Sequence, residues 1–284
     1  MKKLLNIGTV SFIEEIPTDG HSPMHFLCED GANYYCKHRT SIKKEEIQCL
    51  FYEILCSTIL KELNIPTPDI ALTKISEGSF EKNQIKANRY VNTNTVCFGS
   101  KELSNTVLLS NLDSIKSKSD FEKFSNPGDL IRIAIFDFWT MNNDRGKVNE
   151  QSDIRSNNYN ILLKANNKKT EIIAFDHAFT FGAPTFFNLF NPEICLTFDN
   201  GLLSTSFSKQ LIKYITKERR VEIVDGFISS IKQLPLNEII DWIVKEIPKE
   251  WIFHEKIIFD SKNFLSNQLR IERISEHAKS ILLS

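Results

Sequence analysis

NNDRGKVNEQSDIRSNNYNILL, residues 142–163, places an Asp-Arg pair after a largely apolar segment and then runs through an asparagine-rich loop into an aliphatic strand. A loop of this length costs ordering entropy, so a purely structural connection would usually be shorter. The preceding residues 130–141 (LIRIAIFDFWTM) are apolar on nearly every face and predict a mostly buried helix. The pattern indicates that the loop holds something in place.

Length and charge set the limits of the fold and of its partners. The chain has 284 residues and 41% hydrophobic content, enough for the core of one large domain or two lobes. Lys and Arg total 35 against 36 Asp and Glu, so the net charge of -1 gives no reason to expect a nucleic-acid or acidic-membrane partner. No stretch is long enough to span a membrane, and residues 1–17 lack a signal-peptide cleavage site. We expect a cytoplasmic protein.

The cysteines give no evidence for a metal or redox site. The chain has six, without any C-x-x-C pair, which argues against zinc ribbons and dithiol redox motifs. His25 and His38 lie near Cys28 and Cys36, but this spacing matches no standard zinc pattern. We therefore expect small, reduced cysteine side chains.

The first part of the chain has an α+β pattern. Strand-like segments are predicted at residues 7–16, 24–28 and 34–38. Residues 43–63 carry apolar side chains at spacings of three and four, which predicts an amphipathic helix that ends before Pro66 and Pro68. A strand should follow. The polar stretch 88–95 (NRYVNTNT) predicts a boundary between a unit of residues 1–93 and a unit of residues 94–284.

The second part is mainly helical around one hairpin. Residues 161–164 and 171–175 predict two strands joined by a turn, and Asp176-His177 follows the second strand. Helices are predicted at residues 209–216, 222–233, 236–247 and from 261 onwards.

Six polar positions could supply the chemistry of phosphoryl transfer: Lys37, Glu53, Asp144, Asn158, Asn160 and Asp176. Transfer from ATP needs a cation on the phosphates, a carboxylate to position that cation, a carboxylate near the attacking hydroxyl, and oxygen ligands for Mg²⁺. Each residue taken alone also has an ordinary structural explanation: a solvated strand lysine, a helix-surface glutamate, a helix-end charge pair, a turn cap or a loop asparagine. Only their combination and order favour a catalytic site.

Four motifs resemble the HipA-like kinases, a bacterial branch of the protein-kinase and phosphatidylinositol-kinase fold. They are Glu53 with the I-P-T-P at residues 65–68, N-N-D-R at 142–145, N-Y-N-I-L-L at 158–163 and I-A-F-D-H at 173–177. The resemblance runs from about residue 18 to residue 182 and is weak over the last hundred residues. It implies a bilobal protein-kinase-like fold, with a small β-rich N-lobe that carries one helix and a larger, mainly helical C-lobe.

The resemblance also implies roles for individual residues. Lys37 would contact the nucleotide phosphates and pair with Glu53, and Asp144 would orient the acceptor hydroxyl and take its proton. Asp176 would hold Mg²⁺ together with Asn160 or Asn158; Asn149 has the usual kinase spacing after Asp144 but lies roughly ten residues from the strand.

The phosphate-covering loop departs from the known glycine-rich motifs. TDGHSP, residues 18–23, contains neither G-x-G-x-x-G nor G-x-x-x-x-G-K-[ST]. The resemblance nevertheless suggests that the backbone around Gly20, His21 and Ser22 cradles phosphate.

The implied function is an ATP- and Mg²⁺-dependent Ser/Thr protein kinase that transfers the γ-phosphoryl group to a protein hydroxyl. Two alternatives stay open: a kinase-fold phosphotransferase acting on a lipid or small molecule, and a catalytically silent nucleotide-binding or partner-binding module. The sequence does not name the acceptor.

Overall fold

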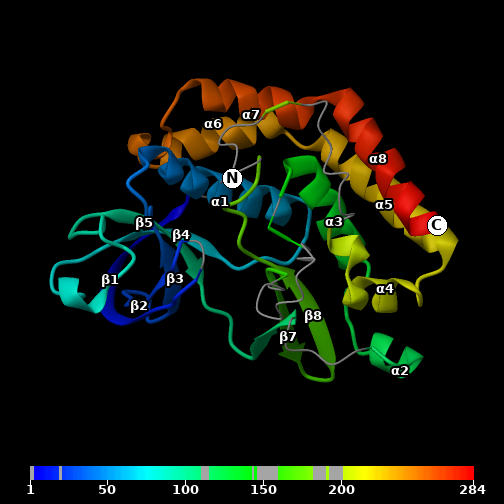
Figure 1. Cartoon of the computed structure of the whole chain (residues 1–284), viewed down its shortest axis with the longest axis horizontal. Helices are drawn as coiled ribbons and strands as arrows, with labels where there is room; N and C mark the ends of the chain where they lie inside the picture. Colours follow the sequence, from blue (N-terminus) through cyan, green and yellow to red (C-terminus); the bar gives the residue numbers. More distant parts are fainter. Residues whose placement is uncertain are drawn as a thin grey trace.

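The computed structural model describes residues 3–18, 21–109, 115–142, 144–145, 159–181, 190–191 and 201–284. Gly20, Asn149, Asn158 and Cys195 lie outside these residues. Within the described part, the chain forms a closed five-stranded barrel, a separate three-stranded sheet and a set of helices around both (Figure 1). No helix among these residues is both long and apolar enough to cross a bilayer.

The barrel confirms the predicted strands and closes through one parallel pair. Its strands are β1 (Leu5–Glu15), β2 (Met24–Cys28), β3 (Asn33–Lys37), β4 (Ile70–Lys74) and β5 (Val96–Lys101), in the order β1-β2-β3-β5-β4. Closure comes from β1, whose first residues pair in parallel with β4. The interior is a small apolar core that includes Met24, Phe26, Tyr34 and Cys97.

The first unit extends beyond the boundary predicted at residue 93. Strand β5 pairs with both β3 and β4, so the barrel is complete only at Lys101. The polar stretch 88–95 instead belongs to the connection between β4 and β5, which also contains the short helix η2 (Lys82–Gln84). The stretch is polar because it is a surface loop that connects two strands of the barrel. Strand β5 follows immediately after it.

Helix α1 (Gln48–Glu62), preceded by η1 (Lys44–Ile47), is buried on all faces rather than amphipathic. Every residue from Gln48 to Leu60 is buried. The helix contacts β5 on one side and α6 (Leu236–Glu246) with η6 (Lys249–Trp251) on another, and Figure 1 shows α6 and α7 (Lys256–Ser266) running along it. Glu53 is therefore an interior residue.

The second sheet contains the predicted hairpin and one strand that the sequence did not reveal. Strands β7 (Ile161–Asn166) and β8 (Lys169–Ala174) are antiparallel, and β6 (Thr106–Leu108) pairs with β7. Three residues are too few for a period-two pattern to be recognised. Helix α3 (Asp129–Thr140) precedes the loop of residues 142–163, and all of its residues except Arg132 are buried, as predicted.

The remaining helices form the rest of the second part. They are α2 (Lys118–Phe121), η5 (Gly201–Ser204), α4 (Ser206–Ile212), α5 (Lys217–Gln233) and α8 (Gln268–Leu283). The helix predicted from residue 261 onwards is in fact two helices, because Asn267 adopts an extended backbone and its side chain accepts a hydrogen bond from the Arg270 N–H as the cap of α8. The buried Arg270 guanidinium in turn donates to the Trp139 carbonyl at 3.0 Å near the end of α3.

Gly99 of β5 tests the packing of the barrel. A Cβ at Gly99 would lie 2.5 Å from Cγ2 of Thr73, a side chain that is fully buried. Thr73 also donates a hydrogen bond from its Oγ1 to the Cys97 carbonyl at 3.2 Å. Rotation of the Thr73 side chain away from a new Cβ would break this bond. We expect Gly99→Ala to lower the free energy of unfolding by about 1–3 kcal/mol in urea titrations, as overpacking does.

Gly226 provides the matched control. It lies inside α5, where an added Cβ would meet no heavy atom within 4 Å. Gly226→Ala should stabilise the protein by up to ~1 kcal/mol because alanine favours helix. A Gly99→Ala protein with the wild-type unfolding midpoint would contradict the close barrel packing.

Candidate active site

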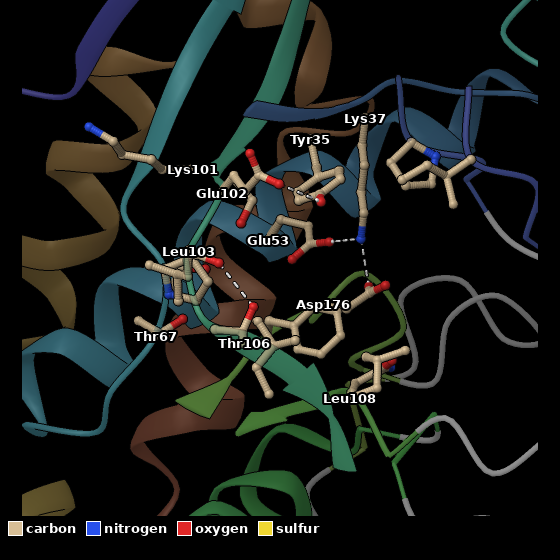
Figure 2. A pocket seen from close by; sticks show the side chains of 18 of the residues that line it. Tyr35, Lys37, Glu53, Thr67, Lys101, Glu102, Leu103, Thr106, Leu108 and Asp176 are labelled. Carbon is tan, nitrogen blue, oxygen red and sulfur yellow. Dashed lines mark hydrogen bonds and ion pairs between the residues drawn. The ribbon is translucent and has the colours of Figure 1, made fainter. Parts of the chain in front are cut away.

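The predicted polar residues meet at one cavity of about 1080 Å³. Its walls come from β3, α1, the β5–β6 connection, the β7–β8 sheet and the segment after β8 (Figure 2). Six of the predicted residues line it: His21, Lys37, Glu53, Asp144, Asn160 and Asp176. Segments far apart in sequence therefore supply one site.

Lys37 lies at the centre of the charged groups. Its Nζ is 2.6 Å from Oε1 of Glu53 and 2.7 Å from Oδ1 of Asp176 (Figure 2). The side chains of Lys37 and Glu53 are 9% and 1% exposed, whereas that of Asp176 is 28% exposed. A second contact joins the same elements, because the backbone N–H of His177 donates to Oε2 of Glu53 at 2.8 Å.

Electrostatics keep Lys37 and Asp176 charged, whereas Glu53 is less firmly ionised. Burial alone would lower the pKa of Lys37, but the carboxylates of Asp176 and Glu53 outweigh it and raise the pKa above its ordinary value. Burial raises the pKa of Glu53 to about 7 against the effect of Lys37. For Asp176 the balance is reversed: burial would raise the pKa, but Lys37 lowers it to about 2. Asp176 is thus the firmly ionised partner.

Asp144 and Asn160 form a second pair at the same cavity. The Asn160 amide Nδ2 donates to Oδ2 of Asp144 at 2.8 Å, and the Asp144 N–H donates to Oδ1 of Asn142 at 3.1 Å. Burial, followed by the negative charge of Asp176, raises the pKa of Asp144. A carboxylate with a raised pKa is a stronger base than one in water, which suits proton abstraction.

Two of the site residues adopt left-handed backbone conformations. Asn160 has φ 48° and Asp176 has φ 57°. Asn and Asp tolerate this region better than other non-glycine residues, but it is uncommon and concentrates at functional sites. Here it turns both residues out of the β7–β8 hairpin at the point where each strand meets the cavity.

The oxygen donors at this edge fit a hard divalent cation. Asp144, Asn160 and Asp176 offer two carboxylates and an amide oxygen, and Mg²⁺ usually takes one or two carboxylates from a protein and keeps several waters. Repulsion between Asp144 and Asp176 raises the pKa of Asp144, and a cation would relieve this repulsion. Among the described residues there is no cluster of three His, Cys, Asp or Glu side chains suited to a metal.

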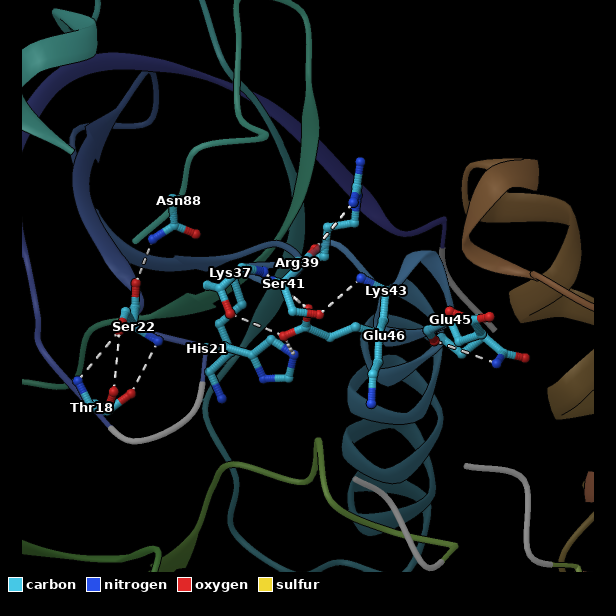
Figure 3. Close-up of polar contacts among 12 residues, drawn as sticks. Thr18, His21, Ser22, Lys37, Arg39, Ser41, Lys43, Glu45, Glu46 and Asn88 are labelled. Carbon is cyan, nitrogen blue, oxygen red and sulfur yellow. Dashed lines mark hydrogen bonds and ion pairs between the residues drawn. The ribbon is translucent and has the colours of Figure 1, made fainter. Parts of the chain in front are cut away.

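The segment predicted to cover the phosphates is held by hydrogen bonds at Ser22. The Ser22 N–H donates to Oγ1 of Thr18 at 3.0 Å, and the Asn88 Nδ2 donates to the Ser22 carbonyl at 2.7 Å (Figure 3). Ser22 itself does not line the cavity, whereas the buried His21 does. The Nε2 of His21 lies 3.6 Å from Oε1 of Glu46, and its ring stacks on Phe179 with centroids 5.7 Å apart.

Glu15 and Asn88 hold this loop and were not found from the sequence. One carboxylate, Glu15, accepts hydrogen bonds from the backbone N–H groups of Lys86, Ala87 and Asn88 at 2.7–3.1 Å. The Asn88 amide donates to the same carboxylate at 2.8 Å and to Ser22, so it links both ends of the loop. No pattern signals this role, because the partners are more than sixty residues apart.

Arg145, for which the sequence suggested only a helix-end charge pair with Asp144, forms its ion pair with Asp137. Its fully buried side chain lies 2.9 Å from Oδ2 of Asp137 in α3. It also donates to the carbonyls of Tyr159, Asn160 and Phe175 and approaches Nδ1 of His177. These groups lie next to Asp144, Asn160 and Asp176, so one guanidinium positions the backbone of all three. The available signal was Asp137, a carboxylate inside an otherwise apolar helix.

A family model described as HipA-like kinase matches residues 11–278. The chain belongs to the HipA-like kinase family. The match includes the helical region where the motifs were weak, and it makes the protein a kinase-type phosphotransferase by family. A search of curated protein sequences gave no match.

Several solved kinase structures are similar to this HipA-like kinase. The proinflammatory kinase CtkA of Helicobacter pylori matches with a TM-score of 0.51 and 12% identity, over 99% of this chain and 98% of CtkA. The Golgi casein kinase matches with a TM-score of 0.46 and 12% identity over 100% and 74% of the two chains. The Rio2 kinase of Chaetomium thermophilum gives 0.41 and 14% over 94% and 72%. The likeness to CtkA shows a protein-kinase-like fold of mixed helices and strands.

The buried Asp137–Arg145 pair should be strongly coupled. Removing one partner leaves the other charge buried without compensation, so Arg145→Gln should cost about 3–5 kcal/mol of unfolding free energy. The double variant Asp137→Asn/Arg145→Gln should lose clearly less than the sum of the two single variants. Urea denaturation of all four proteins measures this coupling. Strictly additive losses would show that the pair does not position the site.

His21 should make stability depend on pH. Burial, and then the charge of Lys37, lowers the pKa of His21 from 6.5 to about 4. The unfolded chain therefore binds this proton more tightly, and stability that is complete above pH 6.5 is lost as the pH falls towards 4. We expect His21→Gln to reduce the fall in unfolding free energy over this range, measured by urea titrations at several pH values. The same pH dependence in both proteins would contradict the burial of a neutral His21.

Proposed function

We propose that this HipA-like kinase is an ATP- and Mg²⁺-dependent Ser/Thr protein kinase, with two lobes and the nucleotide between them. The observation that carries the proposal is the meeting of Lys37, Glu53 and Asp176 with the Asp144–Asn160 pair at one cavity. These groups supply the cation, the positioning carboxylate, the base and the oxygen ligands that phosphoryl transfer needs.

Lys37 binds the nucleotide phosphates in this proposal. Its pKa is raised, so it carries its charge throughout the physiological range. Glu53, at 2.6 Å, keeps the ammonium group at the cavity when phosphate replaces Asp176 as its other partner. His21 and the loop pinned by Asn88 cover the phosphates from the barrel side.

Asp144 acts on the acceptor hydroxyl. It orients the Ser or Thr oxygen and takes its proton while that oxygen forms a bond to the γ-phosphorus. The bond from the γ-phosphorus to the β–γ bridging oxygen breaks, and ADP leaves with the electron pair. Asn160 already holds Oδ2 of Asp144, which fixes the direction of the carboxylate. Bound Mg²⁺, held by Asp176 and Asn160, would neutralise the charge that collects on the phosphate oxygens.

The test is phosphoryl transfer from γ-labelled ATP with Mg²⁺, to the protein itself and to a lysate of proteins. Wild type should incorporate label, and Asp144→Asn should incorporate roughly 10²–10⁴-fold less, the usual contribution of a general base. Asp176→Asn should be equally impaired because it removes a metal ligand. Asp225→Asn, a 54% exposed carboxylate on α5, is the matched control and should behave as wild type.

Two results would contradict the proposal. If wild type labels lipids or small molecules in the lysate but no protein, the enzyme is a phosphotransferase whose acceptor is not a protein. If no label is transferred while Mg²⁺-ATP still raises the melting temperature, and Lys37→Met abolishes this rise, the cavity binds the nucleotide without turnover.

A further inference from the structure

A second hollow of about 600 Å³ lies beside the candidate active site. Tyr159 forms one wall, and residues of η5 and α4, including Lys209 and Lys213, form the others. All of its lining residues carry polar side-chain atoms, and none of them is acidic. It is separate from the nucleotide cavity, with which it shares no lining residue.

The position of this hollow connects it to the acceptor side of the site. Tyr159 directly precedes Asn160, which holds Asp144 at 2.8 Å. The Tyr159 carbonyl also accepts a hydrogen bond from Arg145 at 3.0 Å, so its backbone is fixed relative to the catalytic pair. A chain that presents a hydroxyl to Asp144 can therefore extend into the hollow within a few residues.

The hollow carries two cations that have no counterion within the described part of the chain. Lys209 and Lys213 are four residues apart on α4 and its C-cap, so both lie on one face, and both are exposed. Four other lysines of the C-terminal helices each have a carboxylate within ion-pair distance: Lys232, Lys256, Lys262 and Lys279. Lys209 and Lys213 differ from these in facing a concave surface without such a carboxylate.

The walls are held by internal hydrogen bonds rather than left loose. Gln210 accepts a hydrogen bond from the Ile115 N–H at 2.8 Å and donates to Oγ of Ser206 at 3.1 Å. Thr205, 2% exposed, caps α4 by accepting from the Ser208 N–H at 3.2 Å. The two ammonium groups are the charged groups that the hollow offers to a ligand, and that of Lys213 also lies 4.9 Å from the centroid of the Tyr214 ring.

We propose that this hollow binds an acidic segment of the acceptor protein, so that the enzyme selects Ser or Thr residues followed or preceded by Asp and Glu. The inference rests on the proposed protein-kinase function and names its substrate class. By charge complementarity, Lys209 and Lys213, with no acidic residue among the described lining residues, attract carboxylates and repel basic acceptors.

Peptide binding tests the proposal without relying on turnover. Two fluorescent peptides each contain one Ser, flanked by glutamates in the first and by lysines in the second. Binding is followed by anisotropy with the Asp144→Asn protein, in the presence of Mg²⁺ and ADP. We expect the acidic peptide to bind roughly tenfold more tightly, as two exposed ion pairs allow, and its affinity to fall with salt.

Charge reversal provides the decisive comparison. Adding Lys209→Glu and Lys213→Glu should abolish the preference or reverse it towards the lysine peptide. Lys245→Glu is the matched control and should leave the preference unchanged. Lys245 is an exposed residue of α6, and this helix lies away from α4 in Figure 1. Thermal melting of each variant verifies that the fold is retained.

The outcomes separate this inference from the kinase proposal. Equal affinity for the two peptides, or a preference that survives charge reversal, overturns the docking inference even if wild type transfers phosphate. Displacement of the acidic peptide by a single-stranded DNA oligonucleotide with higher affinity also overturns it, because the hollow would then recognise phosphate backbones. A preference lost on reversal supports docking, even where wild type shows no transfer and the kinase proposal alone fails.

Discussion

One buried lysine joins the three parts of the molecule that form the site. Lys37 comes from the barrel, Glu53 from the central helix and Asp176 from the segment after the second sheet, and all meet within 2.7 Å of Nζ. Burying such charges is costly unless they are paired with good geometry, so each carboxylate requires the lysine and the lysine requires both carboxylates. The barrel, α1 and the β7–β8 hairpin can therefore pack together only in an arrangement that also assembles the cavity.

A second buried cation extends this constraint to Asp144. Arg145 contacts α3, the start of β7 and the end of β8, and so fixes Asp144 relative to Asn160 and Asp176. His177 links the two cations, because its ring contacts Arg145 and its N–H donates to Glu53, the partner of Lys37. The left-handed backbone at Asn160 and Asp176 persists because these contacts determine it from both directions.

The sequence predicted those features that depend on local pattern. The β7–β8 hairpin, the buried helix α3 and the strands β1 to β3 lie within a few residues of their predicted bounds, because alternation and turn residues are short-range signals. The order of Lys37, Glu53, Asp144, Asn160 and Asp176 also sufficed to expect one site, and all five line the cavity.

Features set by distant packing could not be predicted in the same way. Helix α1 was predicted to be amphipathic, but it is apolar on most faces and buried all round, and α6, almost two hundred residues later in the chain, contacts it. The barrel continues to β5 because strand pairing, not local polarity, defines its end. The roles of Arg145 and Asn88 were not predicted for a related reason. Both residues hydrogen-bond to the backbone of other segments, and a sequence does not show which segments come together.

In the proposed mechanism, Lys37, Asp176 and Asn160 bind one nucleotide–metal complex. A crystal structure with a non-hydrolysable ATP analogue and Mn²⁺ tests it most directly, because the anomalous signal of Mn²⁺ locates the metal independently of the nucleotide. We expect a phosphate oxygen next to Nζ of Lys37. We also expect the anomalous peak to mark a metal ion bound by Asp176 and the Asn160 side-chain oxygen. A nucleotide bound elsewhere, or a metal that contacts neither residue, would contradict it.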